Sequence, residues 1–174
     1  MHNFIKRDIE VKCFKLNFLG EGGIDDGGLF RDCLVNITQE LEALTLPLLQ
    51  KTPNNKSDFG NYRECFILNS QARSPVHLKM FKFLGALIGF SILSKQPLAL
   101  NMAPTFWKQI AGQTTMTLED LNSIDTYSYN NLKSTREFGG ALSDEDFAAS
   151  IDLNFTTVLS SGDEVSLCPG GETK

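Results

Sequence analysis

The sequence predicts an α+β domain that is mainly helical, and three observations support this class. Apolar residues recur at helical spacing in several long stretches, whereas residues 11–19 alternate with a period near two, as in a half-buried strand. The chain has 174 residues, of which 41% are hydrophobic and 21% charged. It is therefore long and apolar enough for one domain with a core of its own.

The N-terminal part predicts a strand, a loop and a helix. The run VKCFKLNFL at residues 11–19 predicts a strand with one buried face. Residues 20–28 hold five glycines in nine positions, which excludes regular structure there. A helix is expected next, because Asp25 and Asp26 can cap its start and apolar residues then recur every three or four positions as far as Leu44.

The middle of the chain predicts a short strand followed by a long core helix. Cys65–Leu68 is a short apolar run that is typical of a buried strand. A helix is expected from Ser74, which is followed by proline, to about Ser94. Its apolar run Phe83–Leu93 has about 11 residues, whereas a membrane span needs about 20. Gly85 and Gly89 on this helix are expected to let a neighbouring element approach closely.

The C-terminal part predicts two short helices and an incomplete second unit. One helix is expected over Pro104–Gly112, and a second after Thr117, whose hydroxyl can cap it together with Asp120. The amino-acid composition changes near residue 140, so a domain boundary is expected there. Glu164–Leu167 resembles a strand, and no partner strand follows it.

Charge and targeting signals exclude several kinds of partner. The net charge is −5; residues 1–100 carry 12 Lys or Arg and 10 Asp or Glu, and residues 101–174 carry 4 and 11. The acidic half would repel phosphates, so no nucleic-acid partner is expected. The N-terminus has no apolar segment of the kind found in secretory signals, and the cysteines are widely spaced. A cytoplasmic location with reduced thiols and no membrane partner is therefore expected.

Nucleotide and metal sites are not expected from the residue spacing. The glycine-rich loop precedes a helix, but Asp25 stands where a dinucleotide fingerprint needs glycine, and no Gly-Lys-Ser/Thr follows as in a P-loop. His2 and His77 are the only histidines, and no zinc-type spacing links them to the thiols. The acidic run Asp144–Asp146 lacks the pattern of a calcium loop and is expected to be a solvated face. We therefore expect no cofactor and no bound metal.

One nucleophile and base pair is possible on sequence grounds. Cys65 and His77 are that candidate, because thiol catalysis needs a nearby general base. Cys65 lies in an apolar strand pattern and Cys33 on the apolar face of a helix, so both are expected to be inert core thiols. Phe106 and Trp107 are expected to be core or interface aromatic residues. An independent hydrolase that uses Cys65 and His77 remains an open alternative.

Five motifs resemble, in order, those of one family. Leu19–Asp32 (LGEGGIDDGGLFRD) resembles the segment that opens the HECT domain of HECT-type ubiquitin ligases. The other segments similar to that family are His77–Ile92, Pro104–Gly112, Thr117–Leu132 and Glu164–Gly171. Details such as RECFILN, PLALNMAP and FWKQIAG resemble the large HERC-type members most closely.

The resemblance implies a fold, a division into subdomains and a missing catalytic group. Residues 1–140 are expected to form the large subdomain of the N-terminal lobe of a HECT domain. Residues 141–174 are expected to be the incomplete start of the small subdomain, which docks the ubiquitin-conjugating enzyme. The thioester-forming cysteine is expected in a lobe beyond Lys174. No catalytic residue is therefore expected in this chain, and this excludes Cys13, Cys33, Cys65 and Cys168.

The function implied by the resemblance is ubiquitin transfer from a conjugating enzyme, through the ligase cysteine, to a substrate lysine. This chain would supply part of the scaffold and would be inactive alone. Its partners in the full-length ligase would be the conjugating enzyme, ubiquitin and a protein substrate that the sequence does not identify. The alternative is a non-catalytic, truncated HECT-like protein that acts as a binding or decoy module.

Overall fold

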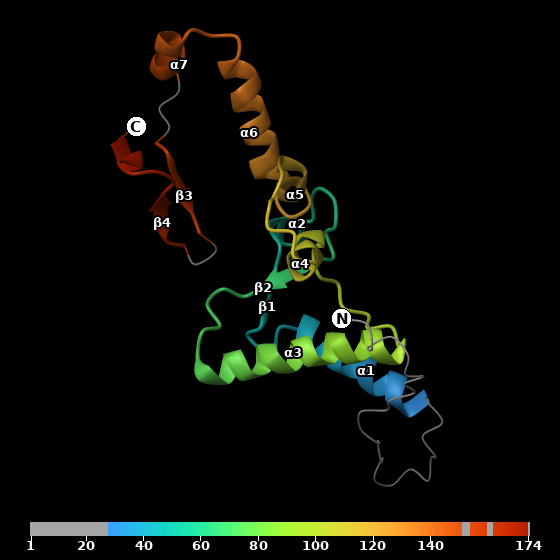
Figure 1. Ribbon diagram of the computed structural model, residues 1–174. Helices are drawn as coiled ribbons and strands as arrows, with labels where there is room; N and C mark the ends of the chain where they lie inside the picture. Colours follow the sequence, from blue (N-terminus) through green and yellow to red (C-terminus); the bar gives the residue numbers. More distant parts are fainter. Residues whose placement is uncertain (1–27, 151–153, 160–161, 174) are drawn as a thin grey trace, which may run out of the picture. The chain divides into compact units, whose positions relative to one another are not determined.

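The computed structural model describes residues 28–150, 154–159 and 162–173. The expected strand at 11–19 and the glycine-rich loop lie outside the described residues, as do Cys13 and His2. In chain order the elements are α1 (Gly28–Glu42), β1 (Leu49–Lys51), α2 (Pro53–Ser57), β2 (Phe66–Leu68), α3 (Pro75–Ser94), α4 (Pro104–Ile110), α5 (Leu118–Asn122), α6 (Thr126–Gly139), α7 (Asp144–Ser150), β3 (Thr156–Val158), β4 (Glu164–Ser166) and a final 3₁₀ turn (Gly171–Thr173). This content confirms the mainly helical α+β class (Figure 1).

The chain divides into two compact units that interleave along the sequence. The first contains residues 1–50 and 72–101, and the second contains residues 51–71 and 102–174. The boundary expected near residue 140 falls inside the second unit, between the end of α6 and the start of α7. The proposed division into a large and a small subdomain stays a prediction.

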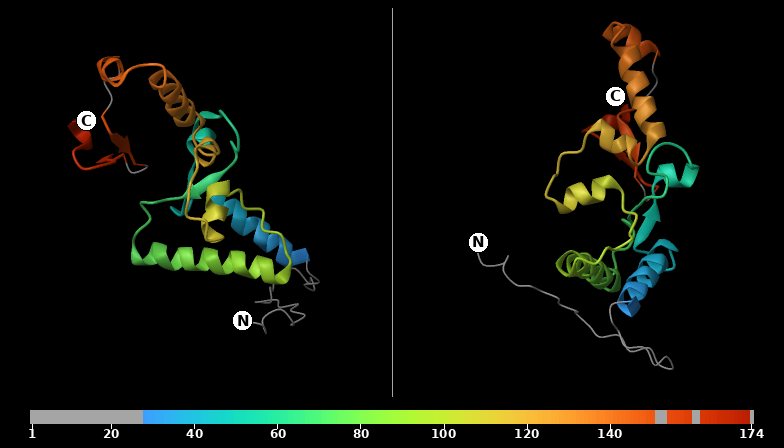
Figure 2. Two further views of the ribbon diagram at one scale, coloured as in Figure 1. Left: turned by 45° about the horizontal axis from the view of Figure 1, so that its top comes forward. Right: turned by 90° about the vertical axis from the view of Figure 1, so that its right-hand side faces the viewer.

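The first unit is built on the packing of α1 and α3, which lie side by side in every view (Figures 1 and 2). Leu34 of α1 and Leu87 and Phe90 of α3 form its buried core. Ile37 and Leu98 pack against this cluster. Burying each of these side chains contributes about 1.5–3 kcal/mol to stability, so the α1–α3 contact stabilises this unit.

The ends of α3 follow the capping rules that predicted them. The hydroxyl of Ser74 accepts a hydrogen bond from the His77 N–H at 3.2 Å, and Pro75 occupies the first turn. The helix ends at Lys95, which adopts a left-handed conformation with φ of 55°. The predicted helix from Ser74 to Ser94 is therefore confirmed.

Only one side of α3 is a core face, and this corrects the sequence-based interpretation. A Cβ atom built at Gly85 or Gly89 meets nothing within 4 Å among the described residues. The expectation that another element approaches closely at these glycines is therefore wrong for the described part of the chain. The buried residues of this helix lie on its other side: Leu84, Leu87, Ile88 and Phe90.

The whole of α3 is long enough to span a membrane, although its apolar run Phe83–Leu93 alone is too short. The helix has 20 residues and a mean hydropathy of 1.5 over its most apolar window, so by length and composition it is able to cross a bilayer. Core helices of globular proteins meet the same criteria. Its packed face against α1 and its two lysines, Lys79 and Lys82, favour a helix that packs within a protein.

The start of the second unit is organised around α2. Thr52 is fully buried and caps this helix, since its hydroxyl accepts the Asn55 N–H at 3.1 Å. The N–H of Thr52 donates to the carbonyl of Cys65 at 3.4 Å, and the Asn55 side chain donates to the same carbonyl at 3.2 Å. These bonds tie α2 to the residue before β2.

Short elements continue the second unit. Phe66 of β2 forms an isolated parallel bridge with Met102, and its carbonyl accepts the Ala103 N–H at 2.9 Å. This contact positions α4, which begins at the next residue. The capping box of α5 formed by Thr117 and Asp120 is present as predicted.

The last described strands form an antiparallel hairpin. The pairs are Thr156↔Ser166, Thr157↔Val165 and Val158↔Glu164. The strand expected at 164–167 therefore has a partner that precedes it in the chain. The expectation that the second unit is incomplete stays a prediction. The N–H of Phe155 donates to the carbonyl of Gly171 at 2.7 Å, so the final turn packs beside β3.

Candidate functional site

The thiol and imidazole that sequence analysis paired as nucleophile and base have separate local environments. Cys65 is buried, with 5% of its surface exposed, and belongs to the second unit. His77 belongs to the first turn of α3 in the first unit, where its main-chain N–H is used in the helix cap. A nucleophilic thiol must be exposed and activated, so the burial of Cys65 supports its interpretation as a core residue.

The other described cysteines are half-buried and form no disulfide. Cys33 lies on α1 and Cys168 follows β4. Cys13 lies outside the described residues. The absence of a catalytic role for these four cysteines stays a prediction.

No metal centre is assembled in the part of the chain that the structure describes. Within these ranges there is no group of three or more His, Cys, Asp or Glu side chains that is able to hold a metal ion. The acidic run Asp144–Asp146 begins α7. The carboxylate of Asp146 accepts a hydrogen bond from the hydroxyl of Ser143 at 2.7 Å, as part of the cap of that helix.

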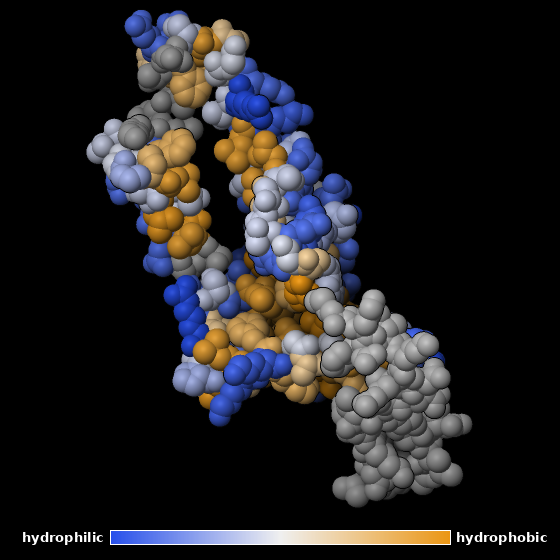
Figure 3. All heavy atoms as spheres, in the orientation of Figure 1, coloured by the Kyte–Doolittle hydropathy of each residue, from blue (hydrophilic) through white to orange (hydrophobic). Residues whose placement is uncertain are grey.

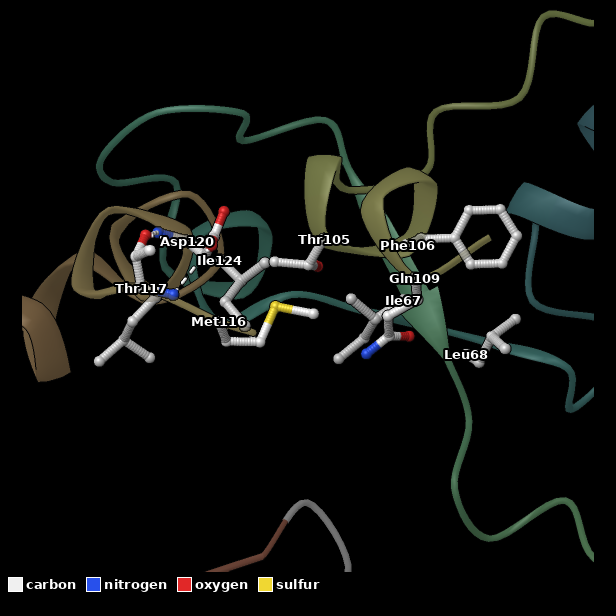
Figure 4. Close-up of a pocket in the computed structure, with 10 residues that line it drawn as sticks. Ile67, Leu68, Thr105, Phe106, Gln109, Met116, Thr117, Asp120 and Ile124 are labelled. Atoms are coloured by element: carbon white, nitrogen blue, oxygen red, sulfur yellow. Dashed lines mark hydrogen bonds between the residues drawn. The ribbon is translucent and has the colours of Figure 1, made fainter. Parts of the chain in front are cut away.

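A pocket of about 350 Å³ opens between β2, α4 and α5 of the second unit (Figure 4). Its volume lies near the lower end of the range for small-ligand sites. Its wall is mostly apolar, with the polar groups Thr105, Gln109, Thr117 and Asp120. The remaining lining residues are Ile67, Leu68, Phe106, Met116, Leu121 and Ile124.

Asp120 is the one ionisable group of this pocket, and its hydrogen bonds define its role. Its carboxylate accepts the Lys108 ammonium at 2.5 Å, the Thr117 N–H at 2.9 Å and the Thr117 hydroxyl at 3.1 Å. The Lys108 hydrogen bond, followed by that from the Thr117 N–H, lowers the pKa of Asp120 below its usual value. Asp120 is therefore an ionised anchor between α4 and α5 and is unsuited to donate a proton near neutral pH.

The aromatic pair of α4 divides between core and surface. Phe106 is buried, and its ring meets that of Trp107 edge-on with centroids 5.0 Å apart. Trp107 is 40% exposed. The sequence-based interpretation of the two as core or interface residues is consistent with this arrangement.

Sequence reasoning identified part of this site and missed the rest. The Thr117–Asp120 capping box was predicted, whereas the link from Lys108 to Asp120 was not. The available signal was weak, because a lysine in the last turn of a short helix is also expected for dipole reasons alone. The pocket itself depends on the placement of β2 beside α4, which local sequence does not report.

Comparison with known proteins identifies the family of this chain. A family model described as HECT-domain (ubiquitin-transferase) matches residues 35–174. The chain is 37% identical to the E3 ubiquitin-protein ligase HERC2 of Mus musculus over 156 residues, which cover 90% of this chain and 3% of that protein. It is 28% identical to the probable E3 ubiquitin-protein ligase HECTD4 of Homo sapiens, covering 91% of this chain and 4% of that protein.

A third relative extends the same result. The E3 ubiquitin-protein ligase TOM1 of Saccharomyces cerevisiae is 30% identical over 131 residues, which cover 74% of this chain and 4% of that protein. The chain belongs to the HECT-domain family. It spans no more than 4% of the length of these three relatives.

Proposed function

We propose that this chain is part of the N-terminal lobe of a HECT-type ubiquitin ligase and serves as scaffold for ubiquitin transfer to substrate lysines. The observation that carries the proposal is the family match over residues 35–174. The α1–α3 core and the Lys108–Asp120 bond between α4 and α5 support a scaffold role, because each holds two helices together.

The catalytic thioester is proposed to form on a cysteine outside this chain. Three features support this part: Cys65 is buried, Cys33 is half-buried on α1, and Cys168 is half-buried after β4. A catalytic thiol has to be exposed and activated, whereas the described thiols are buried or half-buried. A cytoplasmic location is proposed as well, and the wide spacing of the four cysteines along the chain supports it.

The ubiquitin-conjugating enzyme is proposed to dock on a surface that begins with the β3–β4 hairpin. The hairpin and its flanks expose several large apolar side chains, as protein-binding surfaces do: Phe155, Val158, Leu159 and Leu167. A two-stranded hairpin is only marginally stable without further packing. We therefore expect this chain alone to bind a conjugating enzyme weakly or undetectably.

A thioester assay tests the catalytic part of the proposal. The chain is incubated with ubiquitin-charged conjugating enzyme and run on a non-reducing gel, with a complete HECT domain as the positive control. The expected result is no reducible ubiquitin adduct on the 174-residue chain. A reducible band that disappears in one of the variants Cys13→Ser, Cys33→Ser, Cys65→Ser or Cys168→Ser would place the catalytic thiol in this chain and contradict the proposal.

A binding titration tests the docking part. Calorimetry with a panel of conjugating enzymes compares this chain with a longer one that completes the small subdomain. Tighter binding by the longer chain is expected. Equal affinities for the two chains would show that completing the small subdomain adds nothing to docking, and would contradict the proposal that the hairpin is only the beginning of the surface.

A further inference from the structure

Ser143 stands directly before α7 with its hydroxyl group at the surface. The residue is exposed, and so are Glu145 and Asp146 in the first turn of the helix. The Ser143 hydroxyl donates to the Asp146 carboxylate at 2.7 Å and accepts the main-chain N–H of Asp146 at 3.2 Å, and both bonds are exposed to solvent. Figure 3 shows strongly hydrophilic side chains on the surface at α7. An enzyme in solution is therefore able to reach this hydroxyl without opening a core.

The chain around Ser143 is suited to local opening. It lies in the connection of residues 140–143 between α6 and α7, and surface connections are the parts of a fold that enzymes reach most readily. The helix that it caps has seven residues. Helices shorter than about 12–15 residues are marginal on their own, so the start of α7 is able to open at little cost while the rest of the unit stays folded.

The residues around Ser143 favour one class of modifying enzyme. Asp144, Glu145 and Asp146 occupy the three positions after it. A proline does not follow the serine, and Gly140 stands three residues before it, where a base-directed kinase needs arginine. Residues 137–173 contain eight Asp or Glu and no Lys or Arg. Charge complementarity therefore directs this segment to an enzyme with a basic substrate groove.

Thr117 shows what a similar sequence looks like when the structure withholds it. Glu119 and Asp120 follow Thr117 at the second and third positions, much as acidic residues follow Ser143. Asp120, however, is only 5% exposed and accepts the Lys108 ammonium. The Thr117 hydroxyl donates to the same carboxylate at 3.1 Å. A basic groove is therefore unable to engage Asp120 in the folded chain, whereas the acidic residues Glu145 and Asp146 are accessible.

We propose that Ser143 is a phosphorylation site for an acid-directed serine kinase, an enzyme whose substrate groove is lined by Lys and Arg. The Ser143 oxygen attacks the γ-phosphorus of ATP, and an O–P bond forms while the bond from that phosphorus to the β–γ bridging oxygen breaks. The hydroxyl proton passes to a carboxylate of the kinase, and ADP leaves. This inference does not depend on ubiquitin transfer.

Phosphorylation of the complete 174-residue chain in solution tests the proposal. Casein kinase 2 is the acid-directed enzyme, and cyclic-AMP-dependent protein kinase is the base-directed comparison. Tandem mass spectrometry of chymotryptic peptides measures the rate at which each serine and threonine gains phosphate. Circular dichroism checks that each variant keeps its helix content, and Ser143→Ala confirms the assignment of the phosphopeptide.

The expected results distinguish the site and its charge. The acid-directed kinase should modify Ser143 at least about tenfold faster than Thr117, and at least about tenfold faster than the base-directed kinase modifies Ser143. Asp146→Asn should slow the modification of Ser143 at least about fivefold, because it removes a charge that the basic groove contacts. Glu137→Gln, which changes the net charge equally at the end of α6, should leave the rate unchanged.

Four other outcomes would overturn the proposal. Absence of phosphate on Ser143 in the folded chain, with rapid modification of a synthetic peptide of residues 137–150, would show that the cap of α7 protects the hydroxyl. Absence of phosphate on both would show that the sequence is no substrate. Phosphate on Ser160 or Ser161 alone would place the acid-directed site elsewhere in the chain. Equal rates at Ser143 for Asp146→Asn and Glu137→Gln would show that the acidic residues play no part in recognition.

Discussion

The side-chain oxygen of Asn54 accepts a hydrogen bond from the main-chain N–H of Thr126 at 2.7 Å, and so joins α2 to the first residue of α6. The amide nitrogen of Asn54 donates to the carbonyls of Asn61 at 2.9 Å and Asn122 at 3.1 Å. Asn54 is fully buried. One side chain thus satisfies three main-chain groups, one of them seven residues away and the other two in the distant stretch 122–126, and buried polar groups require such partners.

Removing this side chain should destabilise the second unit strongly. Asn54→Ala leaves one N–H and two carbonyls without their partner, and an unpaired buried group costs about 1–3 kcal/mol. We expect a loss of roughly 3 kcal/mol in the free energy of unfolding, measured by urea denaturation. Asn61→Ala is the control, because only the main chain of this exposed residue takes part. Equal losses in the two variants would contradict a role for the Asn54 side chain.

The loop beside Asn54 depends on a glycine. Gly60 has φ of +85°, and an added Cβ would overlap the hydroxyl of Thr126. Gly60→Ala should therefore cost about 1 kcal/mol for the backbone conformation and about 1–3 kcal/mol more for the overlap. Gly112 has φ of +81° with open space around it, so Gly112→Ala should show only the backbone cost. Thermal unfolding measures both, and a Gly60 variant no less stable than the Gly112 variant would refute the steric argument.

Local sequence signals predicted where two helices of this chain begin, but not the contacts that these and other elements make with distant residues. Ser74-Pro75 and the Thr117–Asp120 box fixed the starts of α3 and α5, because capping depends on neighbours in sequence. The roles of Asn54 and Lys108 were not predictable in this way. Asn54 binds Asn122 and Thr126, which lie 68 and 72 residues away. Lys108 binds Asp120, which lies 12 residues away. Only the folded chain brings these groups together.

The motif order predicted the family, while periodicity misjudged α3. An apolar helix in sequence gives no direct sign of how much of its circumference is covered. Leu87 and Phe90 meet α1 as a core helix should, yet Gly85 and Gly89 face open space among the described residues. Composition alone therefore predicted burial on both sides, where the described structure provides it on one.

The Lys108–Asp120 pair should make stability depend on pH in the acid range. The pKa of Asp120 is lowered in the folded state by the Lys108 ammonium and the Thr117 N–H. A lowered folded pKa gives stability that is present above the unfolded pKa, about 3.9, and is lost as pH falls through the folded value. The difference in free energy of unfolding between the parent and Asp120→Asn should therefore be largest near neutral pH and shrink below about pH 4.

An exposed ion pair provides the control for that titration. Asp58 contacts Arg63 at 3.3 Å, but its side chain is 87% exposed, so solvent screens the interaction. Asp58→Asn should change the pH profile less than Asp120→Asn in urea unfolding from acid to neutral pH. If the free energy of unfolding of Asp120→Asn ran parallel to that of the parent at every pH, the charge of the Asp120 carboxylate would contribute nothing to stability.

Alanine substitutions at two helical glycines should have opposite effects on stability. Gly85 lies in the middle of α3 with open space around it, so Gly85→Ala should gain about 1 kcal/mol from helix propensity. At Gly139, the last residue of α6, an added Cβ would lie 2.6 Å from the ring of Phe147, so Gly139→Ala must displace that ring. Thermal unfolding should show a higher midpoint for Gly85→Ala and a lower one for Gly139→Ala. A lower midpoint for Gly85→Ala would mean that some other part of the chain packs against this side of α3.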